Sequence, residues 1–174
     1  MSRRTNNPST GKAEQILAID PGSAKSAWLF YDTSSKCPIP AQHGICDNED
    51  LVRKLKRSHS GPIKQRPPPA ILAIEMIKPR GMPTAWEEML TCVWIGRFIE
   101  AWRGPWSFVY RMEEKMHLCG RANANDANIR AALIDRWGGK EKAVGLKKSP
   151  GPLFGISKDV WAALAVAVTY AERE

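Results

Sequence analysis

The chain has 174 residues, of which 43% are hydrophobic, and this predicts a single domain with room for a proper core. Its 26 lysines and arginines outnumber 18 aspartates and glutamates, and the net charge of +8 favours a polyanionic partner, nucleic acid first. No apolar segment is long enough to span a membrane and the polar N-terminus is unlike a signal peptide, so we expect a cytoplasmic protein.

The cysteines form no CxxC pair and have no histidine at the spacing of a zinc ligand. We therefore expect reduced thiols and no structural zinc. The four residues concerned are Cys37, Cys46, Cys92 and Cys119.

The first element is predicted to be a buried strand that ends in an acid. Residues 1–14 are rich in Ser, Arg, Thr, Asn and Pro and predict a flexible basic tail before a domain over 15–174. The apolar run 16–19 then leads into Asp20, followed by a proline and a glycine. Because a buried, unpaired carboxylate is costly, Asp20 is paired, forms the turn, or binds a cation.

Three elements follow before the pattern of the first strand returns. Loops are expected over 33–40 and over the proline-rich stretch 58–69. The helix expected over 47–57 has acids at its start and bases at its end, an order that suits the helix dipole. The predicted elements are strands over 27–31 and 41–46 and a helix over 47–57.

A second apolar run, over 70–74, again ends in a carboxylate, Glu75. If the two acidic strands lie parallel and adjacent, Asp20 and Glu75 meet at neighbouring strand ends. The loop over 76–83 that follows carries Lys78 and Arg80.

The next helix is predicted from a capping box of Thr84 and Glu87 to Trp102, just before Gly104 and Pro105. It is apolar around most of its circumference, so either a second layer of the protein or a second subunit should cover it.

The remainder of the chain predicts a strand over 106–110 and helices over 111–118 and 126–137, the second stopped by two glycines. A loop over 140–155 then carries several lysines and is either a solvated linker or a phosphate-contacting loop. Its lysines are Lys140, Lys142, Lys147 and Lys148.

The last helix is predicted to begin at Ser157 as N-cap and to be buried because it is almost wholly apolar. Asp159 falls in its first turn, where it either favours the helix dipole or serves a site. The order of elements predicts an α/β fold with a mixed five-stranded sheet, three antiparallel strands and then parallel ones, flanked by helices.

In that fold Asp20, Glu75 and Asp159 can reach one edge of the sheet. Three carboxylates there repel one another unless a cation lies between them, and hard oxygen ligands suit Mg²⁺ or Mn²⁺. Two such ions about 4 Å apart stabilise the attacking and leaving oxygens of phosphodiester hydrolysis. A basic protein with this site is expected to cut nucleic acid.

These motifs resemble those of the RuvC-type Holliday junction resolvases, which have the RNase H-like fold. The stretch 16–22 looks like the first motif of that family, and 73–75 is similar to its second acidic strand. Lys115, 119–120 and 123–130 resemble its central basic region, and Asp159 with 163–167 its C-terminal acidic helix.

The resemblance implies a homodimer that resolves four-way junctions, or other branched DNA, by paired nicks. Asp20, Glu75 and Asp159 would be the catalytic metal ligands for Mg²⁺, with Mn²⁺ as a substitute. The chain looks most like compact members carried by bacteriophages, which would place it in the host-cell cytoplasm. The residues expected to contact DNA are Lys78, Arg80, Lys115, Arg121, Lys140, Lys142, Lys147, Lys148 and Lys158.

The sequence departs from the family pattern at Ala162, where many members carry a second acid three residues after the first. The aromatic wedge that the family often carries after its second acid is also not evident. Two alternatives therefore stay open, a nuclease of RNA–DNA hybrids and a junction-binding module without activity. An actin-like phosphotransferase, which shares the apolar-Asp-x-Gly opening, normally needs a second nucleotide-binding half, and this chain is too short for one.

Overall fold

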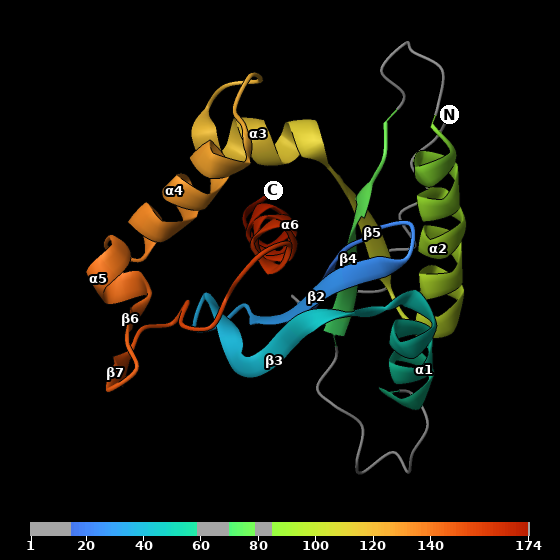
Figure 1. The fold of residues 1–174 in the computed structure, drawn as a ribbon, viewed down its shortest axis with the longest axis horizontal. Helices are drawn as coiled ribbons and strands as arrows, with labels where there is room; N and C mark the ends of the chain where they lie inside the picture. Colours follow the sequence, from blue (N-terminus) through green and yellow to red (C-terminus); the bar gives the residue numbers. More distant parts are fainter. Residues whose placement is uncertain (1–14, 59–69, 79–84, 174) are drawn as a thin grey trace.

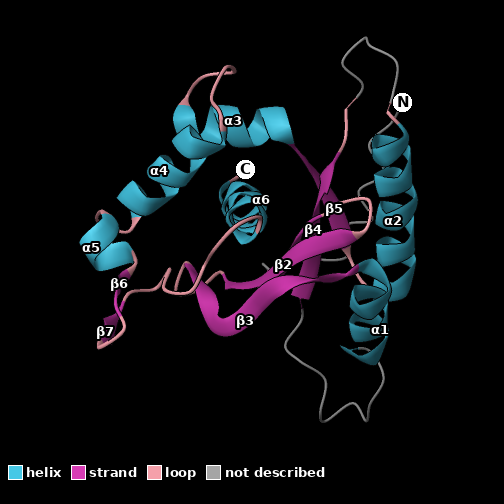
Figure 2. Ribbon diagram, in the orientation of Figure 1, coloured by secondary structure: helices cyan, strands magenta, loops and turns pink. Residues whose placement is uncertain are grey.

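A mixed five-stranded sheet forms the centre of the protein (Figures 1 and 2). The computed structural model describes residues 15–58, 70–78 and 85–173. The strands lie in the order β3-β2-β1-β4-β5, with β1, β2 and β3 antiparallel and β1, β4 and β5 parallel, which confirms the predicted topology. Their bounds are β1 Gln15–Asp20, β2 Lys25–Asp32, β3 Cys37–Asp47, β4 Ala70–Met76 and β5 Trp106–Tyr110.

Helices cover both faces of the sheet because alternate side chains of its central strands point to opposite sides. Ile16 and Ala18 pack on one side under α6 (Val160–Glu172), whereas Leu17 and Ile19 pack on the other side. Figure 1 shows α6 on the first face, with α3 and α4 beyond it, and α1 and α2 on the second. The remaining bounds are α1 Asn48–Ser58, α2 Trp86–Trp102, α3 Arg111–Cys119 and α4 Asp126–Arg136.

Two predicted boundaries are wrong by a few residues. Strand β3 begins at Cys37, inside the predicted loop, and the pairing accommodates the extra residues through a register shift between Leu29 and Tyr31. Helix α2 begins one residue late, with Ala85 as N-cap and its N–H donating to the Glu88 carboxylate at 3.3 Å. Two consecutive glutamates offer this acceptor, so the sequence alone left the register of the cap ambiguous.

The segment 140–155 is not a solvated linker. It forms α5 (Lys140–Ala143) and a small ribbon of β6 (Gly145–Leu146) and β7 (Ser149–Pro150), and it buries Ala143 and Leu153 completely. At Gly151 a Cβ atom would lie 2.2 Å from the Lys142 carbonyl oxygen, so only glycine permits this close approach. The sequence pattern missed the fold here because each piece is very short.

Several predictions fall outside the described part of the chain. These are the tail over 1–14, most of the loop over 58–69, and Arg80 and Thr84. Within the described residues, no helix has the length and apolar character needed to cross a membrane.

Candidate active site

Asp20 and Glu75 lie side by side at the carboxyl ends of two adjacent parallel strands. The register of β1 and β4 pairs Ile19 with Ile74, so the next position on each strand carries the acid. Both acids share the sheet face of Ala18 and Ala73, which is the face covered by α6. The Asp20 carboxyl is within hydrogen-bonding reach of the Glu75 carboxyl. The structure therefore brings together the first two predicted site residues.

This edge of the sheet is unfavourable for negative charge. Burial, followed by the neighbouring Glu75 carboxylate, raises the pKa of Asp20 to about 9, and Glu114 and Asp159 contribute in the same direction. Two carboxyl groups in contact can share a proton or accept a cation between them. With a pKa near 9, Asp20 keeps its proton at neutral pH in the metal-free protein, and a divalent cation would take the place of that proton.

Asp159 lies at the start of α6, although not where the sequence predicted. The helix begins at Val160 instead of after Ser157, because Lys158 adopts a left-handed backbone with φ of 49°. Asp159 is the N-cap residue, but its exposed side chain accepts no capping hydrogen bond. Its carboxylate is the last of the neighbouring charges that raise the pKa of Asp20.

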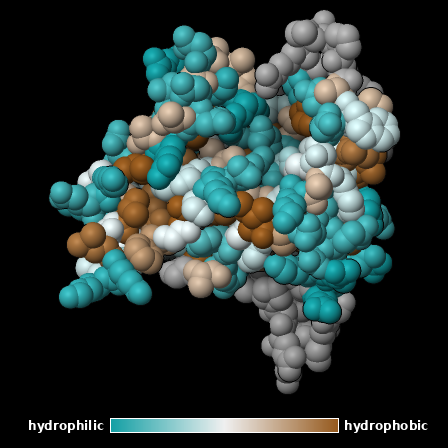
Figure 3. All heavy atoms as spheres, viewed as in Figure 1, coloured by the Kyte–Doolittle hydropathy of each residue, from teal (hydrophilic) through white to brown (hydrophobic). Residues whose placement is uncertain are grey.

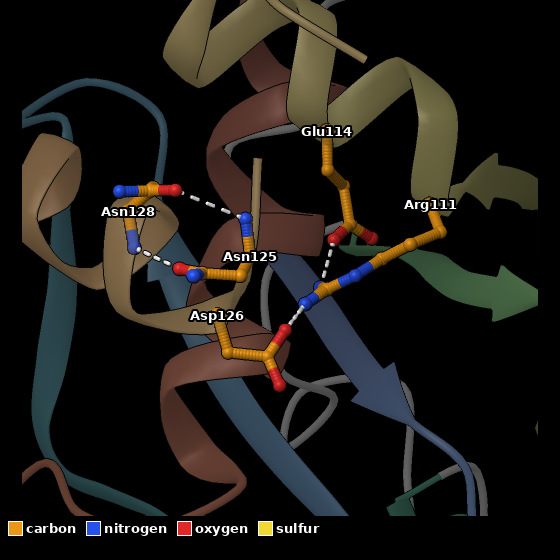
Figure 4. A network of polar contacts seen from close by, with 5 residues as sticks. All are labelled: Arg111, Glu114, Asn125, Asp126 and Asn128. Carbon is orange, nitrogen blue, oxygen red and sulfur yellow. Dashed lines mark hydrogen bonds and ion pairs between the residues drawn. The ribbon is translucent and has the colours of Figure 1, made fainter. Parts of the chain in front are cut away.

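The structure adds a fourth carboxylate, Glu114 on α3, that the sequence analysis did not identify. Its side chain is fully buried, and its Oε2 accepts a hydrogen bond from Arg111 Nη1 at 2.6 Å (Figure 4). Arg111 also forms an ion pair with Asp126 at the start of α4. Burial and the nearby Glu75 carboxylate raise the pKa of Glu114 to about 8.

Glu114 was missed because the charged run at the start of α3 looks like a solvated helix face. The available signal was its position four residues after the end of β5, the strand parallel and adjacent to β4. An i,i+3 pair of Arg111 and Glu114 at that place can turn inward over the sheet edge.

The donor chemistry fits a hard divalent cation. The nearest groups are carboxylates, and Oε1 of Glu114 is buried with no hydrogen-bond partner in the part of the chain that the structure describes. Within residues 15–58, 70–78 and 85–173, however, no three His, Cys, Asp or Glu side chains are grouped closely enough to hold a metal ion. A bound cation would therefore draw in at least one further carboxylate beyond the pair of Asp20 and Glu75.

The predicted DNA contacts divide into two groups. Lys78 and Lys115 follow Glu75 and Glu114 closely in sequence, and Lys158 directly precedes Asp159. Lys78 and Lys158 are exposed. Arg121 is exposed just beyond α3. The second group is exposed on α5 and around the β6–β7 ribbon, which Figure 1 shows beyond the far end of α4. This second group consists of Lys140, Lys142, Lys147 and Lys148.

Comparison with solved structures relates the fold to that of RuvC. The structure matches Thermus thermophilus RuvC with a TM-score of 0.59 and 16% sequence identity, covering 90% of this chain and 93% of that one. It also matches T. thermophilus RuvC in complex with a Holliday junction substrate, with a TM-score of 0.61, 14% identity and coverage of 90% and 92%. No protein-family model and no curated protein sequence matches the chain. The protein therefore has the RNase H-like fold of RuvC, at a sequence identity too low to carry more than the fold.

Proposed function

We propose that the protein is a divalent-metal-dependent endonuclease that cuts four-way junctions or other branched DNA. The contact between the Asp20 and Glu75 carboxyls at adjacent parallel strand ends carries this proposal. It gains support from the shared fold with RuvC, one structure of which holds a Holliday junction, and from the net charge of +8.

In this proposal Asp20, Glu75 and Asp159 hold Mg²⁺ or Mn²⁺. The cation would activate a water and stabilise the leaving oxygen of a phosphodiester. Lys115 and Lys158 lie next to acids of the site and would contact the phosphates on either side of the bond to be cut.

A homodimer forms part of the proposal, because two related sites suit two cuts. Helix α2 leaves Trp86 65%, Met89 48% and Val93 60% exposed, at spacings that place them along one side of the helix. Figure 3 shows apolar surface on this side of the molecule. No described segment of the monomer covers this row, and we propose that a second subunit does so.

A gel assay tests the activity. The full chain is incubated with a synthetic four-way junction, a matched duplex or an RNA–DNA hybrid, with Mg²⁺ or with EDTA. We expect Mg²⁺-dependent nicks in the junction and little cleavage of the other two substrates. Preferred cleavage of the hybrid would instead support the hybrid nuclease, and binding to the junction without turnover would support a module without activity.

Three variants test the site. Asp20→Asn, Glu75→Gln and Asp159→Asn should each lower the rate of cleavage by more than about 100-fold, since even the partner of a metal ligand contributes about 10–100-fold. Junction binding and the fold should persist. Glu113→Gln serves as a control, because Glu113 accepts a hydrogen bond from Tyr110 N and lies outside the proposed site. A variant that cuts at the wild-type rate would remove its residue from the set of ligands.

A further inference from the structure

The carboxylate pair of Asp20 and Glu75 has one buried neighbour that has no assigned role. Glu114 comes from α3, on the same side of the sheet as α6, and interacts electrostatically with both acids. It is 0% exposed, which is unusual for a glutamate. Such burial is tolerated only when the charge is paired or coordinates a metal.

The ion pair with Arg111 satisfies only one of the two oxygens of the Glu114 carboxylate. Arg111 Nη1 donates to Oε2 at 2.6 Å, and Figure 4 shows a dashed line to only one of the two carboxylate oxygens. The other oxygen, Oε1, has no hydrogen-bond partner among the described residues. Leaving a buried acceptor without a partner destabilises the folded state, and the cost is greater when the group is charged. A cation at the neighbouring pair would supply the missing partner.

The last helix lacks the acid that could otherwise complete the site. Ala162 lies one turn after Asp159, so α6 offers a single carboxylate at its start. Helix α3 approaches the same sheet edge from another direction and packs against both α6 and β5. Glu114 can therefore contribute a carboxylate from α3 that α6 does not.

We infer that Glu114 is an additional ligand of the proposed metal site, binding the cation through Oε1 while Arg111 holds Oε2. The inference rests on the proposed function, since it needs a cation at Asp20 and Glu75. Arg111 offsets part of the charge of Glu114, and its second ion pair, with Asp126, lies between α3 and α4. The reciprocal Asn125–Asn128 cap at the start of α4 holds Asp126 in place (Figure 4).

Binding of Mn²⁺ to the full chain without DNA, measured by electron paramagnetic resonance of free Mn²⁺, tests the inference. Glu114→Gln keeps the size of the side chain but removes its charge. We expect the Kd for Mn²⁺ to rise at least about tenfold, as loss of a residue that only orients a ligand already has this effect. Glu113→Gln, the same change one residue earlier, should leave the Kd unchanged.

Two further variants separate ligation from a purely structural role. Arg111→Gln removes a positive charge beside the site, so Mn²⁺ should bind as tightly as in the wild type or more tightly. If Arg111→Gln and Glu114→Gln weaken binding equally, Glu114 acts only by holding Arg111 and the inference is wrong. Should Glu114→Gln not fold, Glu114→Asp keeps the charge but withdraws the carboxylate by one methylene, and the same rise in Kd is expected.

Asp20→Asn distinguishes failure of this inference from failure of the proposed function. If Asp20→Asn loses Mn²⁺ binding while Glu114→Gln and Glu114→Asp bind like the wild type, the metal site exists but Glu114 is not part of it. If Asp20→Asn also binds Mn²⁺ like the wild type, the proposed site itself is wrong.

Discussion

At the scale of single residues, the position of Asp20 is electrostatically unfavourable for the folded protein. Its backbone belongs to the central strand of the sheet, and its carboxyl faces Glu75 with two further carboxylates nearby. These acids do not stabilise the fold, because like charges in a partly buried site destabilise the native state. A binding site for a cation gives the arrangement a physical purpose.

This cost predicts a pH dependence of stability in the metal-free protein. The pKa of Asp20 is raised from 3.8 to about 9, so the native state binds this proton more tightly than the unfolded chain does. In EDTA the contribution of Asp20 to the free energy of unfolding should be full below about pH 4 and lost as the pH rises towards 9.

Asp20→Asn should therefore stabilise the metal-free protein at pH 8 and flatten its stability profile. For a domain of this size, about 1 kcal/mol corresponds to about 2–4 °C in Tm, and we expect at least this increase. Thermal unfolding of both proteins in EDTA from pH 4 to pH 9 measures the effect. Parallel profiles for the two proteins would show that Asp20 has an ordinary pKa in the folded state.

Ala162 supports a second prediction at this scale. The residue lies one turn after Asp159 on nearly the same side of the chain, so an acid there should point towards the same cluster. Ala162→Asp should lower the Mg²⁺ concentration needed for half-maximal junction cleavage, by about threefold or more, because it adds a carboxylate ligand. A Mg²⁺ titration of both proteins checks this. An equal or higher requirement would mean that position 162 does not face the metal.

At the scale of elements, the segment 140–155 combines a folded backbone with solvated charges. Ala143 and Leu153 anchor it to the core, while its four lysines remain exposed. It therefore presents positive charge on a fixed support, which suits contact with the phosphates of a DNA arm away from the cut.

Replacing Lys140, Lys142, Lys147 and Lys148 with glutamine should weaken DNA binding and its dependence on salt. Each phosphate contact that is lost should lower the log–log slope by about 0.9 on duplex arms. Binding titrations of a four-way junction at several salt concentrations measure the slope. If it does not change, these lysines are simply solvated. Glu141→Gln, in the same short helix, is a control that removes a charge of the opposite sign.

At the scale of the whole molecule, the exposed row on α2 predicts a homodimer. Val93 is 60% exposed at one end of this row, one turn after Met89, and burying all three residues would favour association. Symmetric dimers are the commonest oligomers, and a twofold axis relates two sites to two strands of DNA.

Sedimentation of the wild type should show a dimer, and Val93→Glu should shift it towards monomer by burying a charge at the interface. Glu87→Gln, an exposed change on a different side of the same helix, should leave the dimer intact. A wild-type protein that stays monomeric with and without junction DNA would contradict the proposal.

Much of this molecule could be predicted from local patterns in the sequence. Each apolar run that ended in an acid became a strand of the sheet centre, because burial on both faces demands a continuous apolar run and the acid must lie at its end. The parallel pairing of these strands then follows from the helix between them. The order of the elements was therefore enough to predict that Asp20 lies beside Glu75.

Tertiary structure alone decided the rest of the site. Nothing in the run of charges at 111–115 shows that Glu114 turns inward, because its burial depends on how α3 lies over the sheet and against α6. Asp159 became an N-cap residue without a capping bond because Lys158 takes a left-handed backbone, which the helical pattern does not encode. Strand ends follow from local burial, whereas the side chains that meet above them depend on packing between elements distant in the chain.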